Sequence, residues 1–176
     1  MNYTCNFFII FIMLLTFKSI SIDIPDTLIV KTLLKGENDE KFLKQQDFIK
    51  VNYTGWIFDK NKNTSNHCEA KGKLFDSNII EKFNHVQHFQ FTYGIGVVIK
   101  GWDIGLDGMK INEKRCLVIP PNLAYGSRGF GNIIEPNSTL IFEVQLTILE
   151  NITPILAFRS IWANCAGTLG NLPNFF

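Results

Sequence analysis

The chain has 176 residues, enough for one domain with a substantial hydrophobic core but too few for two full domains. Hydrophobic residues make up 46% of it and charged residues 19%, which excludes an intrinsically disordered protein. The formal net charge is only +1, with 17 basic and 16 acidic residues and no basic stripe. This balance argues against nucleic-acid binding and against a polybasic membrane contact.

Residues 1–21 have the features of a cleavable signal peptide. The uncharged apolar run 7–17 would span about 16 Å as a helix, half of a ~30 Å hydrocarbon core. Ser19 and Ser21 then supply small residues two apart, a pattern that signal peptidase accepts. We therefore predict a mature protein in the lumen of the endoplasmic reticulum or secreted. The alternative is a buried N-terminal helix of the fold.

Three cysteines would remain after cleavage, so at most one internal disulfide can form. Cys116 lies in an apolar stretch and is expected to be a small buried hydrophobe. Cys68 and Cys165 lie in loop-like segments and are the candidates for a pair. Whether any of the three pairs is left open by the sequence.

Asn-x-Ser/Thr triplets in the same part of the chain are possible glycosylation sites in a secretory compartment. Asn63, Asn137 and Asn151 begin such triplets, and their occupancy stays open. Asn52 also matches the pattern but lies inside a predicted strand, where access is poor.

Alternation of apolar and polar residues with period two predicts antiparallel strands over most of the mature chain. Strands are expected near residues 27–33, 48–53, 89–93, 115–119 and 139–148. Residues 100–109 are the best candidate for a short helix, with Trp102, Leu106 and Met109 facing the sheet. The predicted fold class is α+β: a curved antiparallel sheet of about five strands, wrapped around one short α-helix and covered on one side.

The domain is expected to occupy residues 22–150, with a polar, exposed loop at residues 59–73. Residues 151–176 form an apolar C-terminal tail whose only charge is Arg159. This tail is compatible with three roles: packing against the domain, binding a partner and contacting a membrane. A tail peculiar to one transcript is a further possibility.

Several motifs that suggest cofactors or catalysis are incomplete. Gly94-Ile95-Gly96 lacks the third glycine of a dinucleotide fingerprint, because Ile99 stands at that position. His85 and His88, with His67 and Cys68 nearby, lack the paired Cys-x-x-Cys spacing of a zinc site. A Gly-x-Ser-x-Gly nucleophile elbow is missing from the sequence. We therefore predict no metal and no cofactor.

Six segments match one protein family in order and spacing. They are Val51-Asn52-Tyr53-Thr54-Gly55, Leu74-Phe75-Asp76-Ser77, Phe89-Gln90-Phe91-Thr92-Tyr93-Gly94, Val98-Ile99-Lys100-Gly101-Trp102-Asp103, Pro120-Pro121-Asn122-Leu123-Ala124-Tyr125-Gly126 and Ser138-Thr139-Leu140-Ile141-Phe142-Glu143-Val144. The chain resembles an FKBP-type peptidyl-prolyl cis-trans isomerase over roughly residues 27–150. With its leader, it is similar to the secretory-pathway (endoplasmic reticulum) subgroup.

The resemblance implies a proline pocket and a role for each matching residue. Trp102 would form the floor of the pocket and Tyr53, Phe89 and Phe142 its walls, with Val98 and Ile99 on the loop entering the helix; Phe75, Asp76, Tyr125 and Ile134 would form the rim. The Ile99 backbone N–H and the Tyr125 hydroxyl would donate hydrogen bonds to carbonyls of the ligand. Asp76 would orient its neighbours. It is not assigned a role as an acid or a base, because rotation about a peptide bond requires no proton transfer. Phe91 and Tyr93 are expected to be core.

The implied function is cofactor-free acceleration of Xaa-Pro bond rotation in proteins folding in the secretory pathway. The catalysis would come from a dry aromatic pocket and hydrogen bonds to the substrate carbonyl. The resemblance implies a monomer that acts on proline-containing polypeptides and binds macrolides of the immunosuppressant type. The alternative is a client-binding or chaperone module of the same fold with little isomerase activity. Phe130, where many members have a polar residue, and the long 59–73 loop depart from the family pattern.

Overall fold

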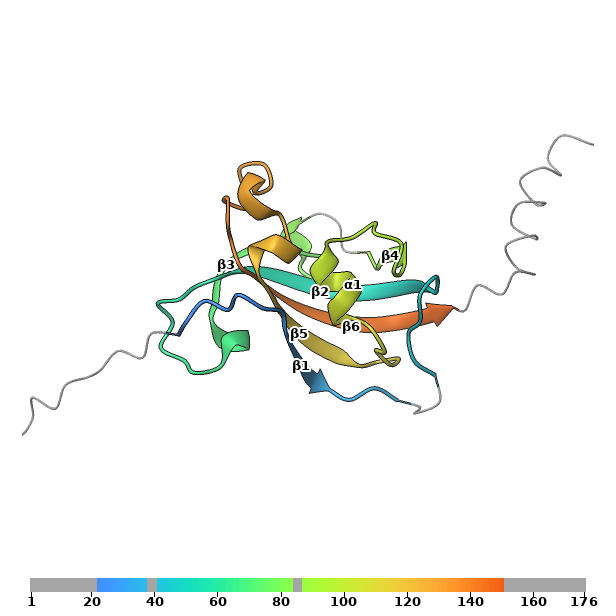
Figure 1. The fold of residues 1–176 in the computed structure, drawn as a ribbon. Coiled ribbons are helices and arrows are strands. Elements are labelled where there is room, and N and C mark those ends of the chain that lie inside the picture. The colour runs from blue at the N-terminus through green and yellow to red at the C-terminus, as the bar shows by residue number, and fades with distance from the viewer. Residues whose placement is uncertain (1–21, 38–40, 84–86, 151–176) are drawn as a thin grey trace, which may run out of the picture.

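The computed structural model (Figure 1) describes residues 22–37, 41–83 and 87–150, so the leader and the tail lie outside the described residues. In the described part the strands are β1 (Ile29–Leu34), β2 (Phe48–Phe58), β3 (Lys71–Ser77), β4 (Phe89–Thr92), β5 (Lys114–Ile119) and β6 (Leu140–Glu150). The helix α1 spans Lys100–Gly105, and short 3-10 helices occupy η1 (His67–Glu69), η2 (Glu81–Phe83), η3 (Pro121–Leu123) and η4 (Gly126–Arg128).

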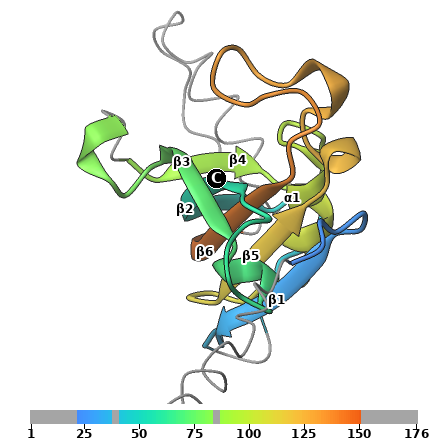
Figure 2. The same ribbon diagram turned by 90° about the vertical axis from the view of Figure 1, so that its left-hand side faces the viewer.

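The strands form one antiparallel sheet in the order β1-β5-β6-β2-β3, with β1 and β3 at opposite edges (Figure 2). The long strand β2 pairs with β4 along its first half and with β3 along its second half. The predicted α+β class and the curved antiparallel sheet are confirmed. The sixth strand, β3, is the one that the sequence did not predict.

The helix α1 lies against one face of the sheet and is shorter than predicted, because it ends at Gly105. Trp102, Leu106 and Met109 are nevertheless all buried in the main core, as their spacing indicated. Leu106 and Met109 reach that core from the turn that follows the helix. The helix therefore delivers Trp102 to the interior face of the sheet.

Two glycines let α1 approach β5 closely. Gly101 and Gly105 lie four residues apart, on the helix face that meets the strand. A Cβ atom at Gly101 would lie 2.3 Å from a methyl group of Ile119, and one at Gly105 would lie 2.7 Å from a methyl group of Leu117. The Arg115 guanidinium also donates to the Gly105 carbonyl at the end of the helix, at 3.0 Å. These contacts fix the depth at which Trp102 enters the core.

The opposite face of the sheet carries a second, smaller core, so the expected one-sided covering is wrong. It consists of Ile22, Phe58, Cys68, Ala70, Cys116, Val118 and Ile141. The loop after β2 folds across this face and buries Cys68 and Ala70. The predicted exposed loop 59–73 accordingly ends at Ala70, and its last three residues belong to β3.

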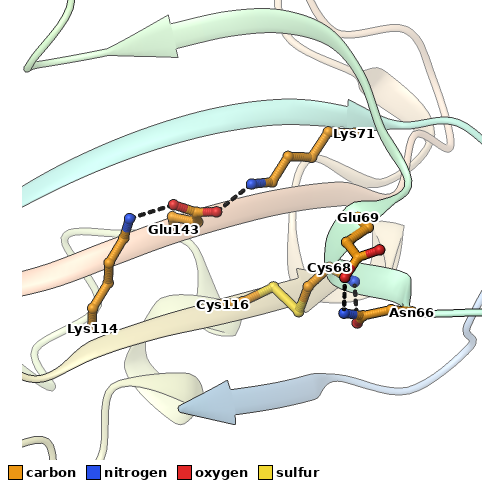
Figure 3. Close-up of a disulfide and its surroundings, with 7 residues drawn as sticks. All are labelled: Asn66, Cys68, Glu69, Lys71, Lys114, Cys116 and Glu143. Atoms are coloured by element: carbon orange, nitrogen blue, oxygen red, sulfur yellow. Dashed lines mark hydrogen bonds and ion pairs between the residues drawn. A yellow bond between two sulfur atoms is a disulfide. The ribbon is translucent and has the colours of Figure 1, made fainter. Parts of the chain in front are cut away.

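A disulfide between Cys68 and Cys116 joins this loop to β5 (Figure 3). The two Cα atoms are 6.2 Å apart and the cysteines are 48 residues apart in the sequence. The sequence left the pairing open, with Cys68 and Cys165 as candidates; Cys68 instead bonds to Cys116, which is buried as predicted but is not a free thiol. Alternation along β5 is the reason, since it points Cys116 to the same face that the loop covers.

Next to the disulfide, the Glu143 carboxylate on β6 accepts from two ammonium groups, those of Lys71 and Lys114 (Figure 3). Burial alone would raise the pKa of Glu143, but the hydrogen bonds and charges of the two lysines outweigh it and lower the pKa. The Lys71 ammonium also lies 4.4 Å from the centre of the Trp56 ring. This cluster connects β3, β5 and β6 across the second face.

We predict that the stability contributed by Glu143 is lost in acid. A carboxyl whose folded-state pKa is lowered stabilises the fold above its unfolded pKa, near 4.5, and ceases to do so as the pH falls through the folded value. Glu143→Gln should cost roughly 1–2 kcal/mol of unfolding free energy at pH 7 and progressively less below about pH 4.5. Urea unfolding of both proteins across that range measures the difference. A difference that is constant with pH would contradict the role of the charge.

Candidate active site

A cavity of about 470 Å³ opens on the face of the sheet that carries α1. It is lined by Tyr53, Phe75, Asp76, Phe89, Val97, Val98, Ile99, Trp102, Tyr125, Phe130 and Phe142. Nine of the ten side chains singled out from the sequence belong to this set. The exception is Ile134, which is 3% exposed and packs in the main core instead of the rim. Val97 was missed, and Phe130, noted only as a departure from the family pattern, also lines the cavity.

The cavity is built around the Trp102 indole, which is 4% exposed. The rings of Phe142 and Tyr53 meet it edge to face, with ring centres 5.3 Å and 5.4 Å away. Phe89 makes the same kind of contact at 6.1 Å. Such T-shaped pairs hold one another in place as well as burying apolar area. The floor and walls therefore form one interlocked set of aromatic rings.

Phe91 and Tyr93, which the sequence assigned to the core, are 7% and 2% exposed and lie in the main core cluster. Tyr93 also has a structural polar contact, because its hydroxyl donates to the carbonyl of Asp103 in α1. Phe91 packs 6.1 Å from Trp102 behind the cavity. Both residues support the floor without lining the cavity.

Gly55 in β2 is a site residue that sequence reasoning did not single out. A Cβ atom there would lie 2.7 Å from the Phe75 ring and 2.8 Å from the Phe142 ring. Because Gly55 has no side chain, the rings of Phe75 and Phe142 can meet beside it, with their centres 5.5 Å apart. A glycine inside a strand is the available signal, since it often marks a close approach of other groups.

We predict that Gly55→Ala displaces both rings and reduces ligand binding while the sheet still forms. The added methyl group overpacks the wall, at a cost of about 1–3 kcal/mol. Titration with a proline-containing peptide, followed by tryptophan fluorescence, measures the loss. Peptide binding equal to wild type in Gly55→Ala would contradict this role.

Tyr53 and Asp76 form the polar edge of the cavity. The Tyr53 hydroxyl donates to Asp76 Oδ2 at 2.7 Å, while Asp76 Oδ1 accepts from the Ser77 N–H at 2.8 Å. Burial, followed by the hydrogen bond and charge of Asp76, raises the pKa of Tyr53 well above its ordinary value. The phenol therefore stays protonated and keeps its ring fixed against Trp102. Asp76 therefore contacts both the Tyr53 hydroxyl and the Ser77 backbone, and its role in orienting its neighbours stays a prediction.

Two further hydrogen-bond donors belong to Tyr125 and Ile99, which also line the cavity. Burial, followed by the Asp76 charge, raises the pKa of Tyr125, so its hydroxyl remains a donor at physiological pH. Ile99 is the N-cap residue of α1, and its backbone N–H has no partner among the described residues. Phe130 stacks at a tilt on Tyr125, with ring centres 5.1 Å apart, and is 56% exposed.

The described residues form no cluster of metal-ligating side chains. Among them, no three His, Cys, Asp or Glu side chains come together as metal ligands. His88 instead lies with Nδ1 3.0 Å from Asn52 Oδ1, and His85 is outside the described residues. In the same described ranges, no helix is long and apolar enough to cross a membrane.

Comparison with known proteins agrees with this geometry. Residues 39–147 match the model of the FKBP-type peptidyl-prolyl cis-trans isomerase family, so the chain belongs to that family. It is 40% identical over 123 residues to FK506-binding protein 2 of Yarrowia lipolytica, covering 70% of this chain and 74% of that protein. It is 39% identical over 123 residues to FK506-binding protein 1A of Aspergillus fumigatus, covering 70% and 96%. Against peptidyl-prolyl cis-trans isomerase FKBP53 of Arabidopsis thaliana, 40% identity extends over 69% of this chain but only 22% of that protein.

Proposed function

We propose that this chain is a peptidyl-prolyl cis-trans isomerase that accelerates rotation of Xaa-Pro bonds in proteins of the secretory pathway. The observation that carries the proposal is the cavity of interlocked aromatic rings centred on Trp102, with the donors of Tyr125 and Ile99 at its border. A pyrrolidine ring is apolar and compact, and it fits a concave, aromatic-lined site of this kind. The preceding carbonyl would then lie near the two donors.

The chemistry requires the enzyme to stabilise a twisted amide. Rotation is slow because the planar peptide bond must lose its resonance, a barrier of ~18–20 kcal/mol. Resonance places negative charge on oxygen and positive charge on nitrogen, so water solvates the planar ground state well. The twisted state has less charge separation. A pocket that excludes water therefore penalises the ground state more than the transition state, and an uncompensated amide costs roughly 1–3 kcal/mol in proteins.

Desolvation alone does not supply the whole acceleration. Uncatalysed exchange takes tens to hundreds of seconds, whereas a median enzyme turns over about 10 times per second. The ratio of ~10³ corresponds to at least about 4 kcal/mol. Hydrogen bonds from the Tyr125 hydroxyl and the Ile99 N–H to the twisted carbonyl would contribute the remainder, because preorganised donors need no reorganisation during the step.

The proposed location rests on two observations. The first is the signal-peptide pattern of residues 1–21. The second is the buried Cys68–Cys116 disulfide, since disulfides persist in oxidising compartments and are rare in the cytosol.

A second candidate function is favoured by the exposed apolar residues around the mouth of the cavity. Val97 and Phe130 line the cavity and are 58% and 56% exposed, and their chain neighbours Ile95 and Ile133 are 54% and 48% exposed. Exposed apolar side chains of this kind are typical of surfaces that hold unfolded or extended clients. A binding module of the same fold would use this rim while the rotation step contributed little. The relatives that are named for FK506 binding suggest that either version accepts a macrolide at the Trp102 cavity.

The test is isomerisation of a short Xaa-Pro peptide by the chain from residue 22 onward, with and without an FK506-type macrolide. The isomerase proposal expects a rate that rises in proportion to protein concentration and falls to the uncatalysed rate with the macrolide. Saturable macrolide binding by folded protein without any acceleration would support the binding module instead. Folding is verified in both cases by the near-ultraviolet circular dichroism of the buried aromatic rings.

A further inference from the structure

Three Asn-x-Ser/Thr triplets fall within the described residues, and the structure places them in very different surroundings. Asn63 lies in the loop between β2 and β3, and Asn137 lies in the turn before β6. Both are exposed. Asn52 lies in the middle of β2 and is only partly exposed. A fourth triplet, at Asn151, lies outside the described residues.

From these surroundings we propose that Asn63 and Asn137 are N-glycosylation sites and that Asn52 is not. The inference rests on the proposed secretory location, because the donor of the glycan is found there. Nδ2 of each asparagine would attack the anomeric carbon of a lipid-pyrophosphate-linked oligosaccharide. One N–C bond forms, the bond from that carbon to the pyrophosphate oxygen breaks, the amide loses one proton, and the lipid pyrophosphate leaves.

Asn63 is presented by a loop that is held in place. The neighbouring Thr64 hydroxyl accepts from the Asn66 N–H at 3.0 Å and donates to Glu69 at 3.2 Å. Two residues past Asn66, the disulfide at Cys68 fastens the loop to β5. Asn63 is therefore an exposed position on an anchored loop, and a glycan there displaces nothing from the second core.

Asn137 is exposed on a turn that is fixed through its backbone. Its N–H donates to the Gly126 carbonyl at 2.8 Å, and its φ of 59 lies in the left-handed region that asparagine tolerates. The side chain borders an open groove of about 500 Å³, lined by Asp26, Pro120, Pro121, Asn122, Gly126, Ser127 and Asn137. That groove shares no lining residue with the Trp102 cavity. A glycan at Asn137 thus has space beside it and leaves the cavity open.

Asn52 lacks such space. It pairs with Gln145 of β6, and its Oδ1 lies 3.0 Å from His88 Nδ1. The small cleft beside it is already bordered by Asn78, Ile79, Gln87 and His88. A glycan on Asn52 would have to leave the sheet between these side chains, beside the contact with His88. Chains that reach this fold are therefore unmodified at Asn52.

The experiment expresses the full chain in eukaryotic secretory cells and maps each glycan to its peptide by mass spectrometry after release with peptide-N-glycosidase. Asn63→Asp, Asn137→Asp and Asn52→Asp are compared, since aspartate keeps the size of the side chain and tolerates positive φ. We expect the first two variants each to lose one glycan and the third to lose none. Enzymatic removal of both glycans should change the isomerisation rate of a short peptide by less than about twofold, because neither asparagine lines the Trp102 cavity.

Two further measurements show whether the chain reached the secretory pathway: its protection from added protease and the oxidation of the Cys68–Cys116 bond. They distinguish failure of the glycosylation proposal from failure of the proposed location. A protected, disulfide-bonded chain that is unmodified at Asn63 or Asn137, or modified at Asn52, overturns the glycosylation proposal and leaves the secretory location standing. A protease-accessible, unmodified chain overturns both. A glycan at Asn151 is assigned by its own peptide and does not enter the comparison.

Discussion

Replacing Trp102 with leucine is expected to lower kcat/KM for a short Xaa-Pro peptide by about 5-fold to 150-fold. The range corresponds to loss of roughly 1–3 kcal/mol of amide desolvation, at 1.36 kcal/mol per decade. Trp102 contacts three other wall rings, so its removal lets water into the cavity. The indole Nε1 is buried without a hydrogen-bond partner among the described residues, so leucine breaks no hydrogen bond in that part of the chain. The loss is therefore attributable to the ring.

The matched control is Trp56→Leu. Trp56 belongs to the second core, on the opposite face of the sheet, and lines no part of the cavity. Both substitutions remove one partly or fully buried indole and both should lower stability, but only the change at Trp102 should lower activity at a temperature where both variants are folded. Equal losses of activity in the two variants would show that stability, not the cavity, controls the rate.

Removal of the Cys68–Cys116 disulfide is expected to produce the largest change in stability. Closing a loop of 48 residues restricts the unfolded chain by about 4 kcal/mol in the chain-entropy model. For a domain of this size, the double variant Cys68→Ala with Cys116→Ala should therefore melt roughly 10–20 °C below wild type. Alanine is chosen because both positions are buried and a serine hydroxyl would lack partners there. Scanning calorimetry measures the shift.

Reducing agent provides the control for the disulfide. It should lower the melting temperature of wild type toward that of the double variant and leave the double variant unchanged. The isomerisation rate below the transition should be similar in all of these samples, because Cys68 and Cys116 face away from the Trp102 cavity. If mass spectrometry shows that both thiols of wild type are reduced and the protein still melts at the temperature of the oxidised form, the stabilising role of the disulfide is contradicted.

The strands with uninterrupted alternation were predictable from the sequence, and so was the buried position of Trp102. β6 is an example, because Leu140, Phe142 and Val144 all enter the main core while Ile141 faces the other way. β3 was not predictable, since Lys71-Gly72-Lys73 shows no alternation and its pairing with β2 contains two irregularities. A strand of this kind is specified by its neighbour and by the anchored loop before it.

The remaining differences depend on contacts between distant segments. Three cysteines allow three pairs, and the choice of Cys116 follows from a loop that folds across the second face. Ile134 was expected at the rim, but its bridge with Phe130 turns the chain so that Phe130 is exposed at the cavity and Ile134 is buried. Local sequence carries no signal for either arrangement.

Magnetisation-exchange NMR of a short proline-containing peptide tests most directly whether the Trp102 cavity rotates the bond, because one sample reports both contact and rotation. The expected result is that the proline ring protons shift under the ring current of the indole, and that cis–trans exchange accelerates in proportion to the same bound fraction. Both effects should disappear in Trp102→Leu and persist in Trp56→Leu. Proline protons that shift in folded wild type without faster exchange would contradict catalysis at this cavity.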